Sequence, residues 1–229
     1  MMALFLKAIL ILHVHPLYVI DGDTFVFDHT RVRLYGLNAP EKGMKCYEEA
    51  KRALEEYLRD DTSMVIIGRD RFGRELAILW NSKGSSLYYL FSRGLAIPYP
   101  YSAPPIALGA LRTALESWRP GCLFRSGNGT VTIISLDYNP PGPDYGKEKV
   151  VVYAKRPTTI TLLNKRWEST TAYVTVGTNT ITFTKPFMGN KGDVVIIHIN
   201  GAFQDGVAYV PKAFTVHLTH TQSSPGVSG

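Results

Sequence analysis

The chain is poor in cysteine, and its two cysteines form no metal-binding pattern. Cys46 and Cys122 are the only ones among 229 residues, and no Cys-x-x-Cys spacing occurs. This count excludes a disulfide-rich fold, and the spacing argues against a zinc site. Two free thiols are the favoured interpretation, with one long-range disulfide as the alternative.

Long apolar runs are also missing. The N-terminal stretch 1–14 is apolar apart from Lys7 and His13, but it is too short for a transmembrane helix. Lys7 lies inside the run and no small-residue cleavage motif follows, so we expect a first strand, with an atypical export signal as the alternative. No later segment could cross a membrane.

Charge is modest and slightly basic, and no internal repeat is present. Hydrophobic residues make up 45% of the chain and charged residues 19%, which excludes a chain disordered as a whole. The formal net charge of +6 favours an anionic partner, with nucleic acid first and an acidic membrane surface second.

Residues 1–125 combine short strands with amphipathic helices. Apolar residues repeat every three or four positions over Cys46–Arg59, which predicts a helix. Shorter helices are expected near Ser86–Ser92 and Ile106–Trp118. The expected strands are β-branched or aromatic runs, namely Ile11–Ile20, Thr24–Phe27, Val32–Leu37, Met64–Ile67 and Glu75–Trp80. Five strands and three helices predict a five-stranded OB-fold barrel.

After a glycine-containing linker at 126–129, the helical period is replaced by alternation with period two. The predicted strands are Val131–Leu136, Lys149–Tyr153, Thr158–Leu163, Thr171–Val176, Thr180–Thr184, Asp193–Ile199 and Val207–Val210. About seven short strands predict an all-β immunoglobulin-like sandwich over 130–221. The fold class is therefore mainly β with helices, in two domains, with a disordered tail at 222–229.

Four short stretches supply the groups that phosphodiester hydrolysis requires. They are Asp21-Gly22-Asp23-Thr24, Arg33, Asn38-Ala39-Pro40-Glu41 and Asp70-Arg71-Phe72-Gly73-Arg74. Together they offer oxygens for a hard divalent cation, a carboxylate that can take a proton from water, and two guanidinium groups for a phosphate. Taken alone, each stretch is better explained as a turn or an exposed strand, so the hypothesis depends on their joint occurrence.

In this order the stretches resemble the staphylococcal-nuclease (thermonuclease) family. The residues that carry the resemblance are Val19–Thr24, Val32–Glu41, Glu49-Ala50, Asp70–Ala77 and Gly94–Ala96. It covers roughly residues 15–125. The resemblance implies a Ca²⁺-dependent endonuclease that hydrolyses DNA and RNA with little sequence preference. The alternative is a non-catalytic module of the same fold that binds nucleic acid or protein.

The resemblance also implies which residues hold the metal. Asp23 would be a direct Ca²⁺ ligand, Asp21 would support the metal site, and the backbone carbonyl of Ala39 would be a further ligand. Asn38 stands where the family's strongest members carry an aspartate. An amide oxygen can still bind Ca²⁺, so we expect weaker metal affinity, and Asn38→Asp is predicted to lower the Ca²⁺ requirement.

Substrate roles follow from the same resemblance. Glu41 would act as general base or orient the attacking water, and Arg33 and Arg74 would clamp the phosphate. The residues expected near the nucleotide are Arg71, Phe72, Tyr99 and Tyr101. Ca²⁺ dependence and indiscriminate substrate choice favour a place outside the cytoplasm over the cytoplasm.

The second half more loosely resembles a lamin-tail domain. The residues that carry this resemblance are Ile133–Tyr138, Glu148, Leu162–Trp167 and Gly192–Val195. A domain of this kind would tether the nuclease to its substrate, to a surface or to a protein partner. The alternative is an unspecialised sandwich.

Overall fold

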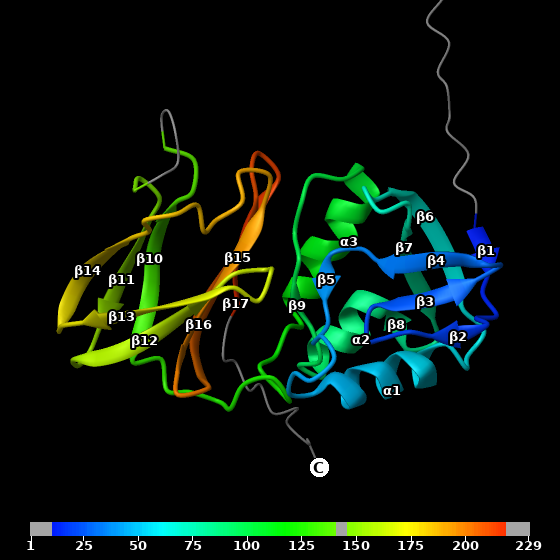
Figure 1. Cartoon of the computed structure of the whole chain (residues 1–229), viewed down its shortest axis with the longest axis horizontal. Coiled ribbons are helices and arrows are strands. Elements are labelled where there is room, and N and C mark those ends of the chain that lie inside the picture. Colours follow the sequence, from blue (N-terminus) through cyan, green and yellow to red (C-terminus); the bar gives the residue numbers. More distant parts are fainter. Residues whose placement is uncertain (1–10, 141–145, 219–229) are drawn as a thin grey trace, which may run out of the picture.

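The computed structural model describes residues 11–140 and 146–218, which form two halves side by side (Figure 1). The first half holds a curled sheet and all three helices of the described chain, and the second half holds strands alone. The protein is therefore mainly β with three helices, as expected. The predicted disordered tail at 222–229 lies outside the described residues.

The main sheet of the first half curls into a half-barrel. Its strands run in the order β1-β6-β7-β4-β3-β2, with β8 paired to β7, and β4 and β7 are parallel. The bounds are β1 Ile11–His13, β2 Tyr18–Val19, β3 Thr24–Phe27, β4 Thr30–Leu34, β6 Ser63–Arg69, β7 Glu75–Asn81 and β8 Gly84–Ser85. Because β1 and β2 are neighbours in the chain but lie at opposite ends of this order, the sheet must curve back on itself. A small second ladder pairs β5 (Leu37–Asn38) with β9 (Ile97–Pro98).

Three helices pack against this sheet. They are α1 (Tyr47–Tyr57), α2 (Ser86–Ser92) and α3 (Pro105–Leu115). The first is shorter at both ends than the predicted 46–59, and the third ends three residues before Trp118. The Ser85 hydroxyl accepts from the Tyr88 amide and caps α2, and Pro105 begins α3, where its missing N–H leaves no helical bond unmade.

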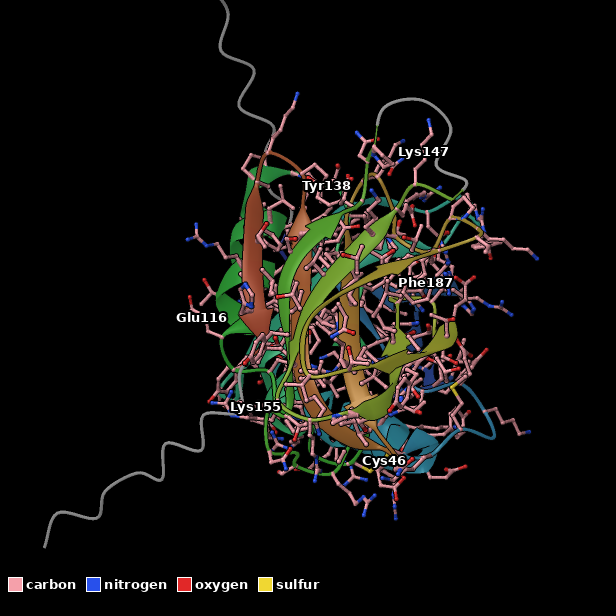
Figure 2. All side chains as sticks on the ribbon, turned by 90° about the vertical axis from the view of Figure 1, so that its left-hand side faces the viewer. Cys46, Glu116, Tyr138, Lys147, Lys155 and Phe187 are labelled. Atoms are coloured by element: carbon pink, nitrogen blue, oxygen red, sulfur yellow. A yellow bond between two sulfur atoms is a disulfide. The ribbon has the colours of Figure 1, made fainter. Side chains whose placement is uncertain are left out.

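The second half contains a three-stranded and a five-stranded sheet (Figure 2). The smaller sheet has the order β10-β11-β14, and the larger has the order β13-β12-β15-β16-β17. The bounds are β10 Val131–Asp137, β11 Lys149–Ala154, β12 Thr158–Leu163, β13 Ser169–Val174, β14 Gly177–Thr182, β15 Asp193–Ile199, β16 Ala202–Val210 and β17 Phe214–Leu218. The prediction missed β17 and the first half of β16, where Gly206 and polar residues interrupt the apolar pattern.

Both faces of the five-stranded sheet are covered. Val195 and Ile197 on β15 belong to the apolar cluster shared with the three-stranded sheet, whereas Val194 and Ile196 belong to the larger core of the first half. This explains why five consecutive residues of β15 are buried without alternation. Across the same boundary the rings of Trp118 and Phe203 lie 5.0 Å apart. Division into two domains stays a prediction, because one core contains residues from both halves.

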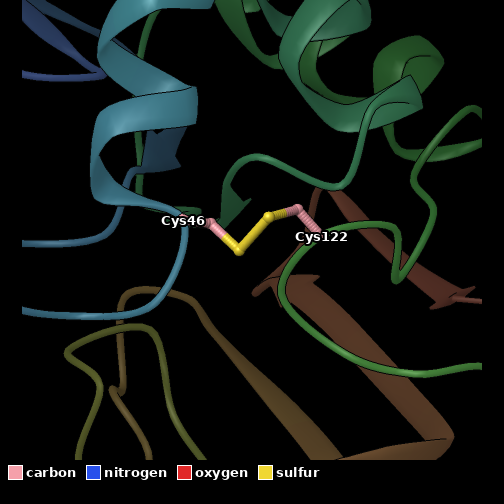
Figure 3. The surroundings of a disulfide bond; sticks show 2 residues. All are labelled: Cys46 and Cys122. Carbon is pink, nitrogen blue, oxygen red and sulfur yellow. A yellow bond between two sulfur atoms is a disulfide. The ribbon is translucent and has the colours of Figure 1, made fainter.

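The preference for free thiols is wrong. Cys46 and Cys122 form a disulfide with a Cα–Cα distance of 6.1 Å, and it joins the start of α1 to the segment after α3 (Figure 3). The sequence left both options open because nothing near either cysteine indicates its partner. Among the described residues, no helix has the length and apolarity to cross a membrane.

Candidate functional site

Asp23 lies at the centre of the candidate site, in the turn before β3. Its Oδ1 accepts hydrogen bonds from Arg33 Nη1 at 2.6 Å and from Thr24 Oγ1 at 2.8 Å, and its Oδ2 accepts from the Ala39 amide at 3.0 Å. The residue is only 2% exposed. Three of the four predicted stretches therefore contribute to the site, since the turn, β4 and β5 converge on this one carboxylate.

The turn that carries Asp23 is pressed between α1 and the segment after β5. A Cβ at Gly22 would lie 2.6 Å from the Ala50 Cβ and 2.7 Å from the Ala39 Cβ, so only glycine fits there. Asp21 Oδ1 accepts from the Asp23 amide at 3.0 Å. The Asp-Gly-Asp motif thus places two carboxylates side by side at the start of β3.

The environment of Asp23 disfavours its charged form. Burial raises the pKa of Asp23 to about 6; the nearby Asp21 adds to this, while the Arg33 guanidinium opposes it. A cation bound beside the two carboxylates would therefore relieve an electrostatic penalty that Arg33 offsets only in part.

Arg33 connects Asp23 to Asn38. Its Nη2 donates to Asn38 Oδ1 at 2.9 Å, and its guanidinium carbon lies 5.7 Å from the centre of the Tyr99 ring. The Asn38 amide nitrogen in turn donates to the backbone oxygen of Lys165 at 2.9 Å. The site is thus tied to the second half through a side chain predicted only as a metal ligand.

The fourth stretch forms a hairpin turn between β6 and β7. Arg74 Nε donates to Asp70 Oδ2 at 2.7 Å, and Asp70 Oδ1 accepts from the amides of Phe72 and Arg74. Partial burial opposes ionisation of Asp70, but the hydrogen bonds outweigh this effect and lower the pKa of Asp70. Arg71 and Phe72 form an exposed cation–π pair at the tip, with 4.8 Å between the guanidinium carbon and the ring centre.

Tyr101 lies near both arginines that the sequence predicts to bind the phosphate. Burial raises the pKa of Tyr101, and Arg33, Arg74 and Asp70 all lie near enough to influence its charge. Its ring also meets that of Tyr99 edge-on, with centres 5.9 Å apart. Both tyrosines therefore lie near Arg33, and their contact with a nucleotide stays a prediction.

Glu41 is not part of the hydrogen-bond network. It is exposed, and among the described residues its carboxylate has no hydrogen-bond or ion-pair partner. It follows Ala39 by two positions, so its backbone lies within about 7 Å of the residue that bonds to Asp23. An unpaired carboxylate at the edge of the site is free to orient a water molecule.

The candidate site offers a metal ion few carboxylate ligands. In residues 11–140 and 146–218, no three His, Cys, Asp or Glu side chains lie close enough together to hold a metal ion by themselves. Asp21 and Asp23 supply two carboxylates, and Asn38 and Ala39 can add neutral oxygens. This set fits Ca²⁺ by chemical type, since calcium accepts carbonyl, amide and water oxygens beside carboxylates.

Sequence reasoning missed Lys165, which the second half places against the site. Its Nζ lies 5.0 Å from the centre of the Tyr99 ring and donates to the backbone oxygens of Pro100, at 3.2 Å, and Gly192. Lys165 is 127 positions from Asn38, and nothing in its stretch Leu162–Trp167 indicates a contact with the first half.

No protein-family model matches the chain, and a search of curated proteins finds no match.

Proposed function

We propose that this protein is a Ca²⁺-dependent nuclease that hydrolyses DNA and RNA with little sequence preference. One observation carries the proposal: Asp23, Arg33 and the Asn38-Ala39 segment form a single hydrogen-bonded cluster, with Asp21 in direct contact. Stabilisation of a phosphodiester transition state requires a bound cation and a positively charged donor to the phosphoryl oxygens. The carboxylates can bind the cation, and the guanidinium group beside them can donate to the oxygens.

The strand order supports a fold of the thermonuclease kind. If β1 and β2 are counted as one bent strand, the order closes as a five-stranded barrel in which that strand meets β3 on one side and β6 on the other. This is the arrangement expected for an OB-fold barrel. For the second half we propose an immunoglobulin-like sandwich of the lamin-tail kind, which would tether the enzyme to a substrate, a surface or a protein.

The residues of the site divide the chemistry among them. Asp21, Asp23, Asn38 and Ala39 would hold Ca²⁺, which when bound offsets the charge of the phosphate. Each Nη of Arg33 keeps a second N–H beyond the bond that it makes now, so the guanidinium can still donate to a phosphoryl oxygen.

Glu41 and Arg74 complete the proposed mechanism. Glu41 takes a proton from the attacking water, because its carboxylate is exposed and unpaired among the described residues. Arg74 is anchored to Asp70 through Nε alone, which leaves its two terminal nitrogens for the phosphate. Exposed Phe72 and half-buried Tyr99 offer faces on which bases can stack, which favours single-stranded ends.

A non-catalytic nucleic-acid-binding module is the second candidate. The Arg33–Asp23 ion pair favours it, since Arg33 occupies oxygens of both Asp23 and Asn38 that a metal ion would need. In that case the arginines and aromatic rings would bind a nucleic acid strand without cleaving it.

A cleavage assay separates the two candidates. Purified protein is incubated with single-stranded DNA, double-stranded DNA and RNA in Ca²⁺, Mg²⁺ or EDTA. We expect Ca²⁺-dependent cleavage, and a rate reduced roughly 100-fold or more in Glu41→Gln, because the general base is lost. Glu116→Gln, which changes an exposed glutamate after α3 (Figure 2), is the matched control and should cleave at the parental rate. A protein that binds DNA or RNA but cleaves neither in the presence of Ca²⁺ or Mg²⁺ would instead support the binding module.

A location outside the cytoplasm belongs to the same proposal. A disulfide between Cys46 and Cys122 is in keeping with an oxidising compartment, where structural disulfides persist.

A further inference from the structure

The turn between β12 and β13 reaches from the second half to the candidate site (Figure 1). It comprises residues 164–168, and the backbone oxygen of Lys165 at its start accepts the hydrogen bond from Asn38 Nδ2. Both residues are buried, with 6% of Asn38 and 8% of Lys165 exposed. This hydrogen bond is therefore shielded from water, and the low dielectric constant around it strengthens it.

Among amino acids of this shape, only asparagine can bond to both neighbours of position 38, Arg33 and Lys165. Its oxygen faces a guanidinium donor of Arg33, and its nitrogen faces the carbonyl acceptor of Lys165. An amide has one acceptor end and one donor end, whereas an ionised aspartate has two acceptor ends. A carboxylate here would set an oxygen against the Lys165 oxygen at the present separation of 2.9 Å.

The Lys165 turn is itself held firmly by both halves. Asp193 Oδ1, which is buried, accepts from the Lys165 amide at 2.9 Å. The Lys165 ammonium bonds to the Pro100 oxygen of the first half and to the Gly192 oxygen of the second. The carbonyl that Asn38 meets is thus fixed by a buried network and is not a flexible loop atom.

We propose that the Lys165 turn of the second half is a positioning element of the nuclease site. It orients the Asn38 amide, and Asn38 orients the Arg33 guanidinium against Asp23. The inference rests on the proposed function, because it assigns Arg33 its phosphate-binding role. It also replaces the expectation drawn from charge alone: Asn38 is present because the second half requires a donor there, and Asn38→Asp should impair the site.

The first test is Asn38→Asp in the full chain, with cleavage rates measured at saturating substrate over a range of Ca²⁺ concentrations. We expect a rate reduced roughly 10- to 100-fold that added Ca²⁺ does not restore, because Arg33 loses its orientation. A variant that cleaves at the parental rate or faster, at lower Ca²⁺, overturns the inference.

The second test asks whether Lys165 acts through Asn38. Lys165→Met keeps the length of the side chain but removes its bonds to Pro100 and Gly192, and Asn38→Ala removes the intermediary. We expect each to lower kcat, with the substrate KM changed less, and the double variant to cleave within about twofold of the slower single variant. Reductions that multiply would indicate independent effects and overturn the inference. Lys155→Met, at an exposed lysine of the second half, is the matched control (Figure 2).

An inactive parent would refute the proposed function without deciding this inference. The parent, Asn38→Ala, Lys165→Met and the double variant are then compared by their Kd for a single-stranded DNA oligonucleotide in EDTA. Equal weakening in the single and double variants supports the positioning role. Additive weakening, or none, overturns it.

Discussion

Removal of the Cys46–Cys122 bridge should strongly destabilise the fold. The bridge closes a loop in which the two cysteines are 76 positions apart. In the chain-entropy treatment, releasing a loop of this length stabilises the unfolded ensemble by about 4.5 kcal/mol at 25 °C. For a chain of this size that loss corresponds to a melting temperature lower by roughly 10 °C. Cys46→Ser/Cys122→Ser is the appropriate variant, because either single change leaves a reactive thiol.

The measurement is urea unfolding of parent and double variant, followed by far-UV circular dichroism and by tryptophan fluorescence. Coincident transitions would establish that one free energy describes each protein. A reducing agent should lower the stability of the parent to that of the variant and leave the variant unchanged. The chain-entropy reasoning is refuted if the double variant lies within about 1 kcal/mol of the oxidised parent.

Two further predictions concern charged groups of the site. Arg74→Lys should lower kcat roughly 100-fold with little change in melting temperature, since a lysine cannot donate in two parallel bonds. Arg69→Lys, which changes an exposed side chain at the end of β6, should be neutral. The raised pKa of Asp23, about 6, means that its contribution to stability is complete at low pH and lost as the pH rises through 6. Without Ca²⁺, the free energy of unfolding of the parent relative to Asp23→Asn should therefore fall by about 2 kcal/mol from about pH 4 to about pH 8; a flat difference would contradict this.

Local patterns were sufficient for most elements of the fold. The strands Thr24–Phe27, Thr158–Leu163 and Asp193–Ile199 and the helix Ser86–Ser92 have the predicted bounds. Each is flanked by turn residues such as glycine, asparagine or aspartate, which set its ends. The predicted strand Ile11–Ile20 is instead split into β1 and β2, because Pro16, which has no amide proton for a ladder, lies between them.

Contacts between distant segments could not be predicted in the same way. The pairing of Cys46 with Cys122 depends on how α1 and the segment after α3 approach each other, which only the packed core determines. The burial of β15 on both faces has the same origin. Its apolar run predicted a strand, but the run itself does not indicate that one face would pack on the first half and the other on the three-stranded sheet.

The candidate site illustrates both situations at a single residue. Motif order was enough to bring Asp23, Arg33 and Asn38 together, because β3, β4 and β5 follow one another in the chain and meet at one end of the curled sheet. From charge alone, Asn38 is then expected to bind a metal ion more weakly than an aspartate would. The Lys165 oxygen changes that interpretation, since it demands a donor at the position where a carboxylate would offer a second acceptor. The identity of residue 38 is thus explained by a hydrogen bond from the other half of the chain.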